Sequence, residues 1–123
     1  MKLLEHKEQT TLLHWWLLAH RSFCLPEAVL FAIPNGGARS VTTGALLKAE
    51  GVRAGVPDLF LAVSRGGFYG LFIEMKKAKG GIVSSAQHEM CDILQAQGYA
   101  CKICHGWIAA KDAIELYLNA AKV

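Results

Sequence analysis

The apolar residues of the chain recur with two different periods, and these periods predict where helices and strands form. Residues 4–20 predict a long helix, because four apolar side chains would fall on one broad helical face. These are Leu12, Leu13, Trp16 and Leu17. Residues 29–33 form a short, continuous apolar run that predicts a buried strand. Residues 34–37 read Pro-Asn-Gly-Gly, and they predict the turn that ends this strand.

The rest of the chain alternates between short helices and strands. Ser84 stands three residues before Gln87, which is the spacing of a capping box at the start of a helix. Gly98 is placed to end that helix, and Gly51 to end a shorter one that Thr42 or Thr43 caps. The expected elements are a short helix at 42–50, strands at 58–63 and 69–76 joined by a turn at 64–67, a helix within 84–98, a strand at 99–104 and a helix at 108–121.

This order of elements, α-β-(short α)-β-β-α-β-α, predicts an α/β sandwich around a mixed sheet with one antiparallel hairpin at its centre. The chain has 123 residues, of which 53% are hydrophobic and 19% charged, and this is the balance of a globular protein that can bury a core. The sequence shows neither repeats nor long linkers. We therefore expect one domain spanning residues 1–123.

The expected hairpin brings three charged residues together. If its turn is centred near Gly66, residues whose numbers sum to about 132 face each other, and Asp58 stands opposite Glu74. Opposed residues on neighbouring strands have Cβ atoms about 4.5–5.5 Å apart. Glu74 and Lys76 project from the same face, because side chains alternate along a strand. Two carboxylates and an ammonium group are thus predicted to converge at one place.

Two carboxylates this close repel each other, and a hard divalent cation such as Mg²⁺ or Mn²⁺ relieves the conflict. A metal ion held there would polarise a phosphoryl oxygen and activate a bound water, and Lys76 would orient that water or stabilise the developing negative charge. The alternative is a solvated strand end with a weak surface salt bridge between Glu74 and Lys76. The apolar runs 59–61 and 71–73 argue against it, because they mark both strands as buried.

Four motifs follow one another along the chain, at residues 34–37, 51–59, 74–76 and 84–87. Together they resemble the VRR-NUC (virus-type replication-repair nuclease) domain, a branch of the PD-(D/E)XK nuclease superfamily, and the similarity runs over residues 5–117. The resemblance implies a restriction-endonuclease-like αβββαβ core with helices on both faces of a mixed sheet, and a phosphodiesterase that depends on a divalent metal. Asp58 and Glu74 would be metal ligands and Lys76 the catalytic lysine.

The family also places a glutamate in its first helix and a glutamine at the start of a later one. The glutamine matches Gln87, which the capping box also explains. Glu5 and Glu8 are both candidates for the glutamate, which would be a catalytic residue. We favour Glu5, as a third metal ligand, because it forms an E-x-x-x-Q pair with Gln9 on one helical face. Glu8 lies about 60° round the helix.

A polyanionic partner is compatible with the formal net charge of +3. Candidate contacts to DNA phosphates surround the expected metal site: Asn35, Arg39, Lys48, Arg53, Lys77 and Lys79. Such contacts position DNA without reading its sequence, so selection by shape is expected. The resemblance is to stand-alone phage and prophage proteins that act as homodimers on four-way junctions, which implies a branched-DNA substrate and a dimer. Trp15 is the residue that we expect on the dimer surface.

Four cysteines, Cys24, Cys91, Cys101 and Cys104, leave an alternative open. Residues 101–105 read Cys-x-x-Cys-His, a pattern of haem attachment and half of a zinc site. A buried strand with both cysteines packed inward is the simpler explanation.

The chain lacks a recognisable secretion signal, and its most apolar stretch, residues 12–19, is shorter than the roughly 20 residues that span a bilayer. We therefore expect a cytoplasmic protein of a bacterial host cell, phage or prophage encoded, with reduced cysteines. The rival hypotheses are a non-catalytic DNA-binding scaffold with a nuclease-like core and a cysteine-based metal or redox protein.

Overall fold

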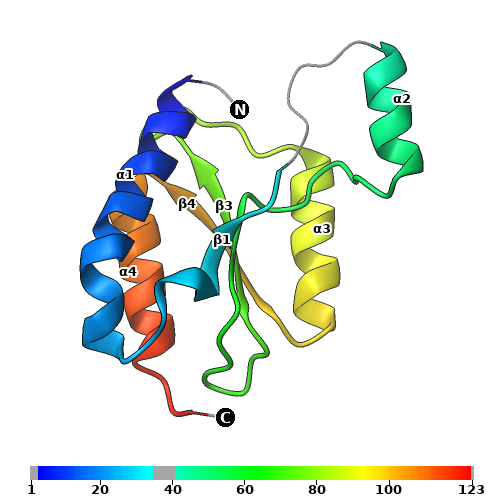
Figure 1. The fold of residues 1–123 in the computed structure, drawn as a ribbon. Helices are drawn as coiled ribbons and strands as arrows, with labels where there is room; N and C mark the ends of the chain where they lie inside the picture. The colour runs from blue at the N-terminus through cyan, green and yellow to red at the C-terminus, as the bar shows by residue number, and fades with distance from the viewer. Residues whose placement is uncertain (1–2, 35–40, 123) are drawn as a thin grey trace.

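The computed structural model describes residues 3–34 and 41–122, and it has the predicted order of elements with two added 3-10 helices (Figure 1). None of the described helices is long and apolar enough to cross a bilayer. The elements are α1 (Leu3–Ala19), η1 (His20–Phe23), η2 (Glu27–Val29), β1 (Leu30–Ala32), α2 (Val41–Ala49), β2 (Leu59–Leu61), β3 (Leu71–Lys76), α3 (Ser85–Ala96), β4 (Ala100–His105) and α4 (Trp107–Leu118).

Four strands form one mixed sheet in the order β1-β2-β3-β4. The first two pairings are antiparallel and the third, between β3 and β4, is parallel. In the central hairpin Leu59 pairs with Ile73 and Leu61 with Leu71, so the paired numbers sum to 132. The predicted register is therefore confirmed. Because a shift of one residue would turn every side chain to the other face, this register decides which residues can meet.

Helices cover both faces of the sheet, as the fold class predicts. α1 and α4 lie side by side on one face, and α3 lies on the other (Figure 1). The hydrophobic core lies under α1 and α4, where Leu12, Trp16 and Ile114 pack against the apolar side chains of the strands. The core residues of β3 are Leu71 and Ile73, with Met75 beyond them.

The opposite face of the sheet carries the alternate residues of each strand. Phe60, Phe72 and Tyr99 form an aromatic cluster there, with ring centroids 4.3–6.0 Å apart. Continuing the alternation beyond this cluster puts Glu74 and Lys76 on the α3 face, at the end of the sheet where β3 ends. The apolar core and the charged residues thus lie on opposite faces of the same strand.

Three local expectations are wrong. β1 is an edge strand of three residues, preceded by η2, and Phe31 and Ala32 are exposed rather than buried. Leu17 does not join the buried face of α1, because 52% of it is exposed. Trp15 is half-buried against the core, with the Lys111 ammonium 5.9 Å from its ring centroid, so it is not the exposed residue we expected.

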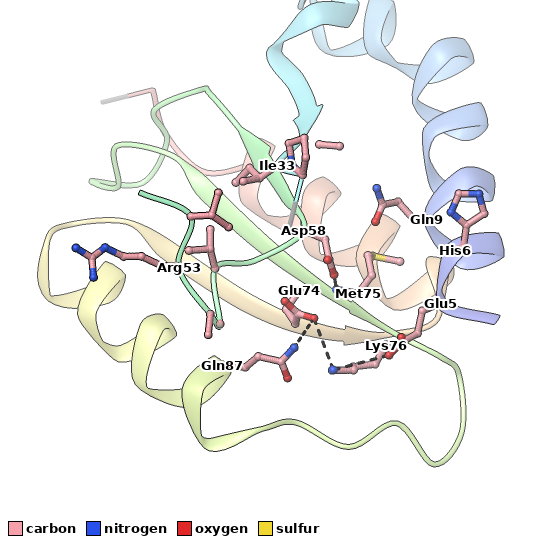
Figure 2. Close-up of a pocket in the computed structure, with 16 residues that line it drawn as sticks. Glu5, His6, Gln9, Ile33, Arg53, Asp58, Glu74, Met75, Lys76 and Gln87 are labelled. Carbon is pink, nitrogen blue, oxygen red and sulfur yellow. Dashed lines mark hydrogen bonds and ion pairs between the residues drawn. The ribbon is translucent and has the colours of Figure 1, made fainter. Parts of the chain in front are cut away.

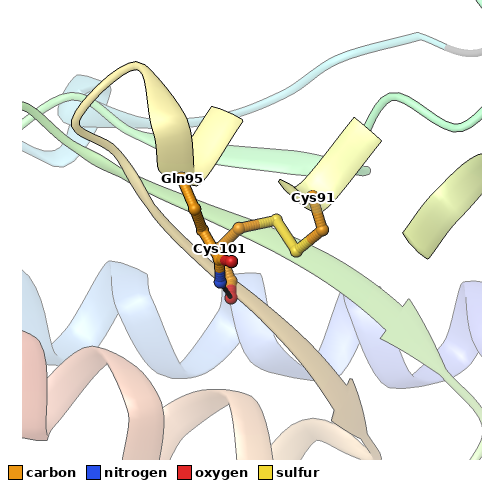
Figure 3. Close-up of a disulfide and its surroundings, with 3 residues drawn as sticks. All are labelled: Cys91, Gln95 and Cys101. Atoms are coloured by element: carbon orange, nitrogen blue, oxygen red, sulfur yellow. Dashed lines mark hydrogen bonds between the residues drawn. A yellow bond between two sulfur atoms is a disulfide. The ribbon is translucent and has the colours of Figure 1, made fainter. Parts of the chain in front are cut away.

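The expectation of four reduced cysteines is also wrong. Cys91 of α3 and Cys101 of β4 form a disulfide, with Cα atoms 5.6 Å apart (Figure 3). Cys104 is a free thiol buried in the core on the other face, and burial raises its pKa to about 11. Cys101 and Cys104 therefore do not form a paired thiol site. As predicted, both cysteines of this strand are buried.

The disulfide should stabilise the attachment of α3 to the sheet. Its sequence separation is 10 residues, and closing a loop of that length in the unfolded chain corresponds to about 2–3 kcal/mol. Reduction, or the double substitution Cys91→Ser with Cys101→Ser, should therefore lower the melting temperature in calorimetry. The exposed Cys24 provides the control, since Cys24→Ser should leave it unchanged. Equal melting of the oxidised protein and the double variant would contradict this prediction.

Candidate active site

A pocket of about 760 Å³ opens where α1, the loop before β2, the end of β3 and the start of α3 meet (Figure 2). Its walls include five of the residues predicted for the catalytic site: Glu5, Asp58, Glu74, Lys76 and Gln87. These residues are far apart in the sequence and come from four different parts of the fold. The hairpin register is what brings the two carboxylates of the central strands together.

Asp58 is held by the strand opposite it. The residue follows the buried Pro57 at the point where the chain enters β2, and its Oδ2 atom accepts a hydrogen bond of 2.8 Å from the Met75 amide. The Asp58 carbonyl also accepts a hydrogen bond from the Ile33 amide, 2.7 Å long, which fixes the backbone from the other side. The carboxylate is thereby directed to the place where β3 carries Glu74.

Gly55, three residues earlier, allows the loop before β2 to approach α3. Its φ angle is +86°, and a Cβ atom at this position would clash with the Ala86 carbonyl. A side chain here would therefore have to push the start of α3 away from the loop. This close approach is what puts Gln87 within reach of the sheet.

Gln87 connects the helix cap to Glu74. The predicted capping box is confirmed: the Ser84 side chain accepts a hydrogen bond from the Gln87 amide, and Gln87 Oε1 accepts one from the Ser84 amide. The other end of the same side chain, Nε2, donates a 3.0 Å hydrogen bond to Glu74 Oε2. One side chain therefore both caps the start of α3 and holds a buried carboxylate in position.

Lys76 lies between two glutamates. Its Nζ atom is 3.7 Å from Glu74 Oε2 and 3.7 Å from Glu5 Oε1 (Figure 2). Lys76 is only 7% exposed and Glu74 5%, so this is a buried charged group and not a solvated strand end. The alternative of a weak surface salt bridge therefore does not describe these residues.

Both strand carboxylates are difficult to ionise in this setting. Burial and repulsion from Asp58 raise the pKa of Glu74 from 4.5 to about 8. Burial also raises the pKa of Asp58, although the hydrogen bond from the Met75 amide opposes the increase. The nearby Lys76 lowers the pKa of both but does not compensate for burial. Two adjacent acids whose charged forms are destabilised are what an added cation would relieve.

The structure separates the two first-helix candidates. Glu5 lines the pocket and faces Lys76. The Glu8 Oε1 atom accepts a 2.9 Å hydrogen bond from the Trp107 amide at the start of α4. The N-cap residue of α4 is Gly106, which has no side chain to cap the helix, so Glu8 provides the cap. Of the two alternatives, only Glu5 therefore lines the candidate site, and Glu8 connects α1 to the start of α4.

This assignment predicts opposite phenotypes for the two glutamates. Glu8→Ala should lower the free energy of unfolding by about 1 kcal/mol, as the loss of a helix cap does, and leave activity nearly unchanged. Glu5→Ala should have the converse effect, with little loss of stability and a clear loss of activity. Denaturant unfolding together with an activity assay measures both. A Glu8→Ala protein that is inactive but normally stable would reverse the assignment.

The predicted DNA contacts are only partly gathered at the pocket. Arg53 lines its wall, whereas Lys48, Lys77 and Lys79 do not. Asn35 and Arg39 lie outside the described residues. The sequence reasoning missed His6, which lines the pocket beside Glu5 and could have been found as its neighbour on the same helix.

The chain is similar to a known protein family and to a solved structure. The model of the VRR-NUC domain family matches residues 2–107. The chain belongs to the VRR-NUC family. A solved structure described as a VRR_NUC domain protein is 27% identical, with a TM-score of 0.84, and the match covers 99% of this chain and 93% of that one. No curated protein matches the chain significantly. The predicted resemblance and fold class are thus confirmed, and VRR-NUC is a family of nuclease type.

The donor set of this VRR-NUC chain fits a hard divalent cation. Asp58 and Glu74 supply carboxylate oxygens, and the Gln9 Oε1 atom is buried without a hydrogen-bond partner although Gln9 lines the same pocket. Residues 3–34 and 41–122 contain no group of three or more His, Cys, Asp or Glu side chains that forms a metal site alone. Glu5 faces Lys76 instead of completing such a group. Mg²⁺ commonly binds through one or two carboxylates, with water and phosphate oxygens completing its shell.

Proposed function

We propose that this VRR-NUC chain is a divalent-metal-dependent endodeoxyribonuclease that hydrolyses phosphodiester bonds in branched DNA. The observation that carries the proposal is the buried pair Asp58 and Glu74, whose pKa values are both raised, with the Lys76 ammonium 3.7 Å from Glu74 Oε2. A buried pair of acids beside a lysine is costly for folding and suits a site that binds a cation.

In this mechanism Asp58 and Glu74 would hold Mg²⁺ or Mn²⁺, and Glu5 would become a third ligand from the side of α1 by turning away from Lys76. The bound ion would polarise a phosphoryl oxygen and lower the pKa of a water molecule. Lys76 is placed to orient the attacking water or to stabilise the negative charge that develops on the phosphate. Gln87 keeps the Glu74 carboxylate in position through its Nε2 hydrogen bond. Arg53 would contact the phosphate backbone at the wall of the pocket.

The preference for branched DNA rests on how the substrate would be held. Contacts from Arg53, Lys48, Lys77 and Lys79 to phosphates would select DNA by its shape. We further propose that residues 1–123 act as one domain in a homodimer, since two active sites related by a two-fold axis would make paired cuts across a four-way junction. A bacterial cytoplasm, with a phage or prophage gene as the source, is the setting in which we expect this activity.

The test is cleavage of a synthetic four-way junction and of linear duplex DNA with the same sequences, in Mg²⁺, in Mn²⁺ and in EDTA. We expect cleavage of the junction with either metal, slower cleavage of the duplex and none in EDTA. Cleavage that survives EDTA would contradict the metal mechanism. Tight binding of the junction without cleavage in either metal would instead favour a DNA-binding scaffold.

A further inference from the structure

His105 lies in line with the proposed catalytic residues across the end of the sheet. β2 runs antiparallel to β3 and β4 runs parallel to it, so the start of β2 and the ends of β3 and β4 meet at the same edge. The parallel register pairs Lys76 with His105. Paired residues on neighbouring strands project from the same face, so His105 stands beside Lys76 on the face that α3 covers.

Backbone contacts fix this end of β4. The Gly106 amide donates a 2.9 Å hydrogen bond to the Lys76 carbonyl, which connects the residue after His105 directly to the end of β3. Gly81, in the loop between β3 and α3, lies over both side chains: a Cβ atom there would be 2.9 Å from Lys76 Cβ and 3.4 Å from His105 Nδ1. His105 is nevertheless exposed, and it does not line the pocket that holds Asp58 and Glu74.

We propose that His105 is a further substrate-contacting residue, whose imidazole N–H donates a hydrogen bond to a phosphate of the cleaved strand beyond the scissile bond. The inference rests on the proposed nuclease function and extends it to the face of β4. Neighbouring strands lie about 4.8 Å apart, and Lys76, the partner of His105, stands two residues beyond the position opposite Asp58, so His105 and Asp58 are about 12 Å apart across β3. Successive nucleotides advance about 3.4 Å along the helix axis, so the contacted phosphate lies about three to four nucleotides from the reaction.

The charge of the site explains why another donor is needed there. The Lys76 ammonium lies between Glu5 and Glu74 in the pocket, where it would act at the scissile phosphate, so a phosphate farther along the strand would be contacted by another residue. His105 is the residue next to Lys76 across the ends of β3 and β4, and its exposed imidazole can donate an N–H hydrogen bond. The short histidine side chain loses less conformational freedom on binding than a lysine would.

His105 is also the histidine of the Cys-x-x-Cys-His sequence. In this motif Cys101 is bonded to Cys91 and Cys104 is buried in the core, so the two cysteines do not form a pair that could hold haem or zinc.

The first experiment compares the affinity of His105→Ala, His105→Lys and wild-type protein for a fluorescent four-way junction in Ca²⁺, by anisotropy. His105→Ala should raise Kd about three- to tenfold, as the loss of one phosphate hydrogen bond does, and His105→Lys should restore it. His14→Ala, an exposed histidine of α1 away from the pocket, is the matched control and should bind normally. Melting curves of all variants show whether each is folded.

The second experiment locates the contact. Single phosphates of the junction are replaced by neutral methylphosphonates, one position at a time. Wild-type protein should lose affinity at a position about three to four nucleotides from the cut, and His105→Ala should show no further loss there. Equal losses for both proteins at every position would overturn the proposed contact, and so would unchanged affinity of a folded His105→Ala protein.

Cleavage by the wild-type protein in Mn²⁺ is measured with the same preparation, so the two proposals can fail separately. Normal cleavage with unchanged binding by His105→Ala overturns the His105 contact alone. Weakened binding by His105→Ala without any wild-type cleavage overturns the nuclease function and leaves the contact. A protein that does not bind the junction overturns both.

Discussion

Replacement of Asp58 or Glu74 by alanine should lower the rate of DNA cleavage by at least about a hundredfold, because each removes half of the carboxylate pair that would hold the metal ion. Lys76→Ala should cause a loss of similar size, since the ammonium is the positive group beside that pair. Single-turnover cleavage of a labelled junction measures these rates. Asp92→Ala on the exposed surface of α3 is the matched control for charge removal and should cleave normally.

Replacing either carboxylate should raise the stability of the metal-free protein, whereas replacing a residue that stabilises the fold would lower it. The raised pKa values mean that burial of the two acids opposes folding when they are ionised. Without metal at pH 8, either carboxylate variant should therefore melt at a higher temperature than wild type. The gain should be smaller for Asp58→Ala, because that variant also loses the hydrogen bond from the Met75 amide. A folded carboxylate variant with a near-normal rate would contradict the assignment of that residue.

Stability and metal binding should also depend on pH in opposite directions. The pKa of Glu74 rises from 4.5 in the unfolded chain to about 8 in the fold, so the folded state binds more protons between these values. In the metal-free protein the contribution of Glu74 to the free energy of unfolding should therefore be fully present below about pH 4.5 and be lost as the pH rises through 8. The Glu74→Gln variant, which cannot titrate there, should lack this loss.

Metal binding reverses the sign, because the ligand must be deprotonated and binding releases its proton. The affinity for Mn²⁺ should increase by up to about tenfold per pH unit below pH 8 and level off above it. Titration calorimetry in two buffers of different ionisation enthalpy measures both the affinity and the number of protons released. An affinity independent of pH between 6 and 8 would show that no protonated acid is displaced.

Much of this arrangement could be predicted from the sequence because it depends on local patterns. The capping box at Ser84 and Gln87 identifies the start of α3, and alternation along two apolar runs with one turn fixes the register that pairs Leu59 with Ile73. That register alone puts Asp58 opposite Glu74. The length of β1 could not be predicted in the same way, because an apolar run does not reveal whether it is central or at an edge.

The contacts that the sequence left open depend on distant parts of the chain. Glu5 and Glu8 are one helical turn apart, and only the position of α4 shows that Glu8 binds the Trp107 amide 99 residues away. The pairing of Cys91 with Cys101 likewise depends on how α3 lies on β4, which spacing does not determine. His105 went unnoticed as a neighbour of Lys76 because the parallel register between β3 and β4 was not predicted.

The central claim is that one cation is shared by the carboxylates of Asp58 and Glu74, beside Lys76. A crystal grown or soaked with Mn²⁺ tests it most directly, through the anomalous difference map. We predict a peak in contact with an oxygen of both side chains, at about 2.0–2.3 Å from each. A peak elsewhere in an active crystal form, or none between these two residues at saturating Mn²⁺, would contradict it.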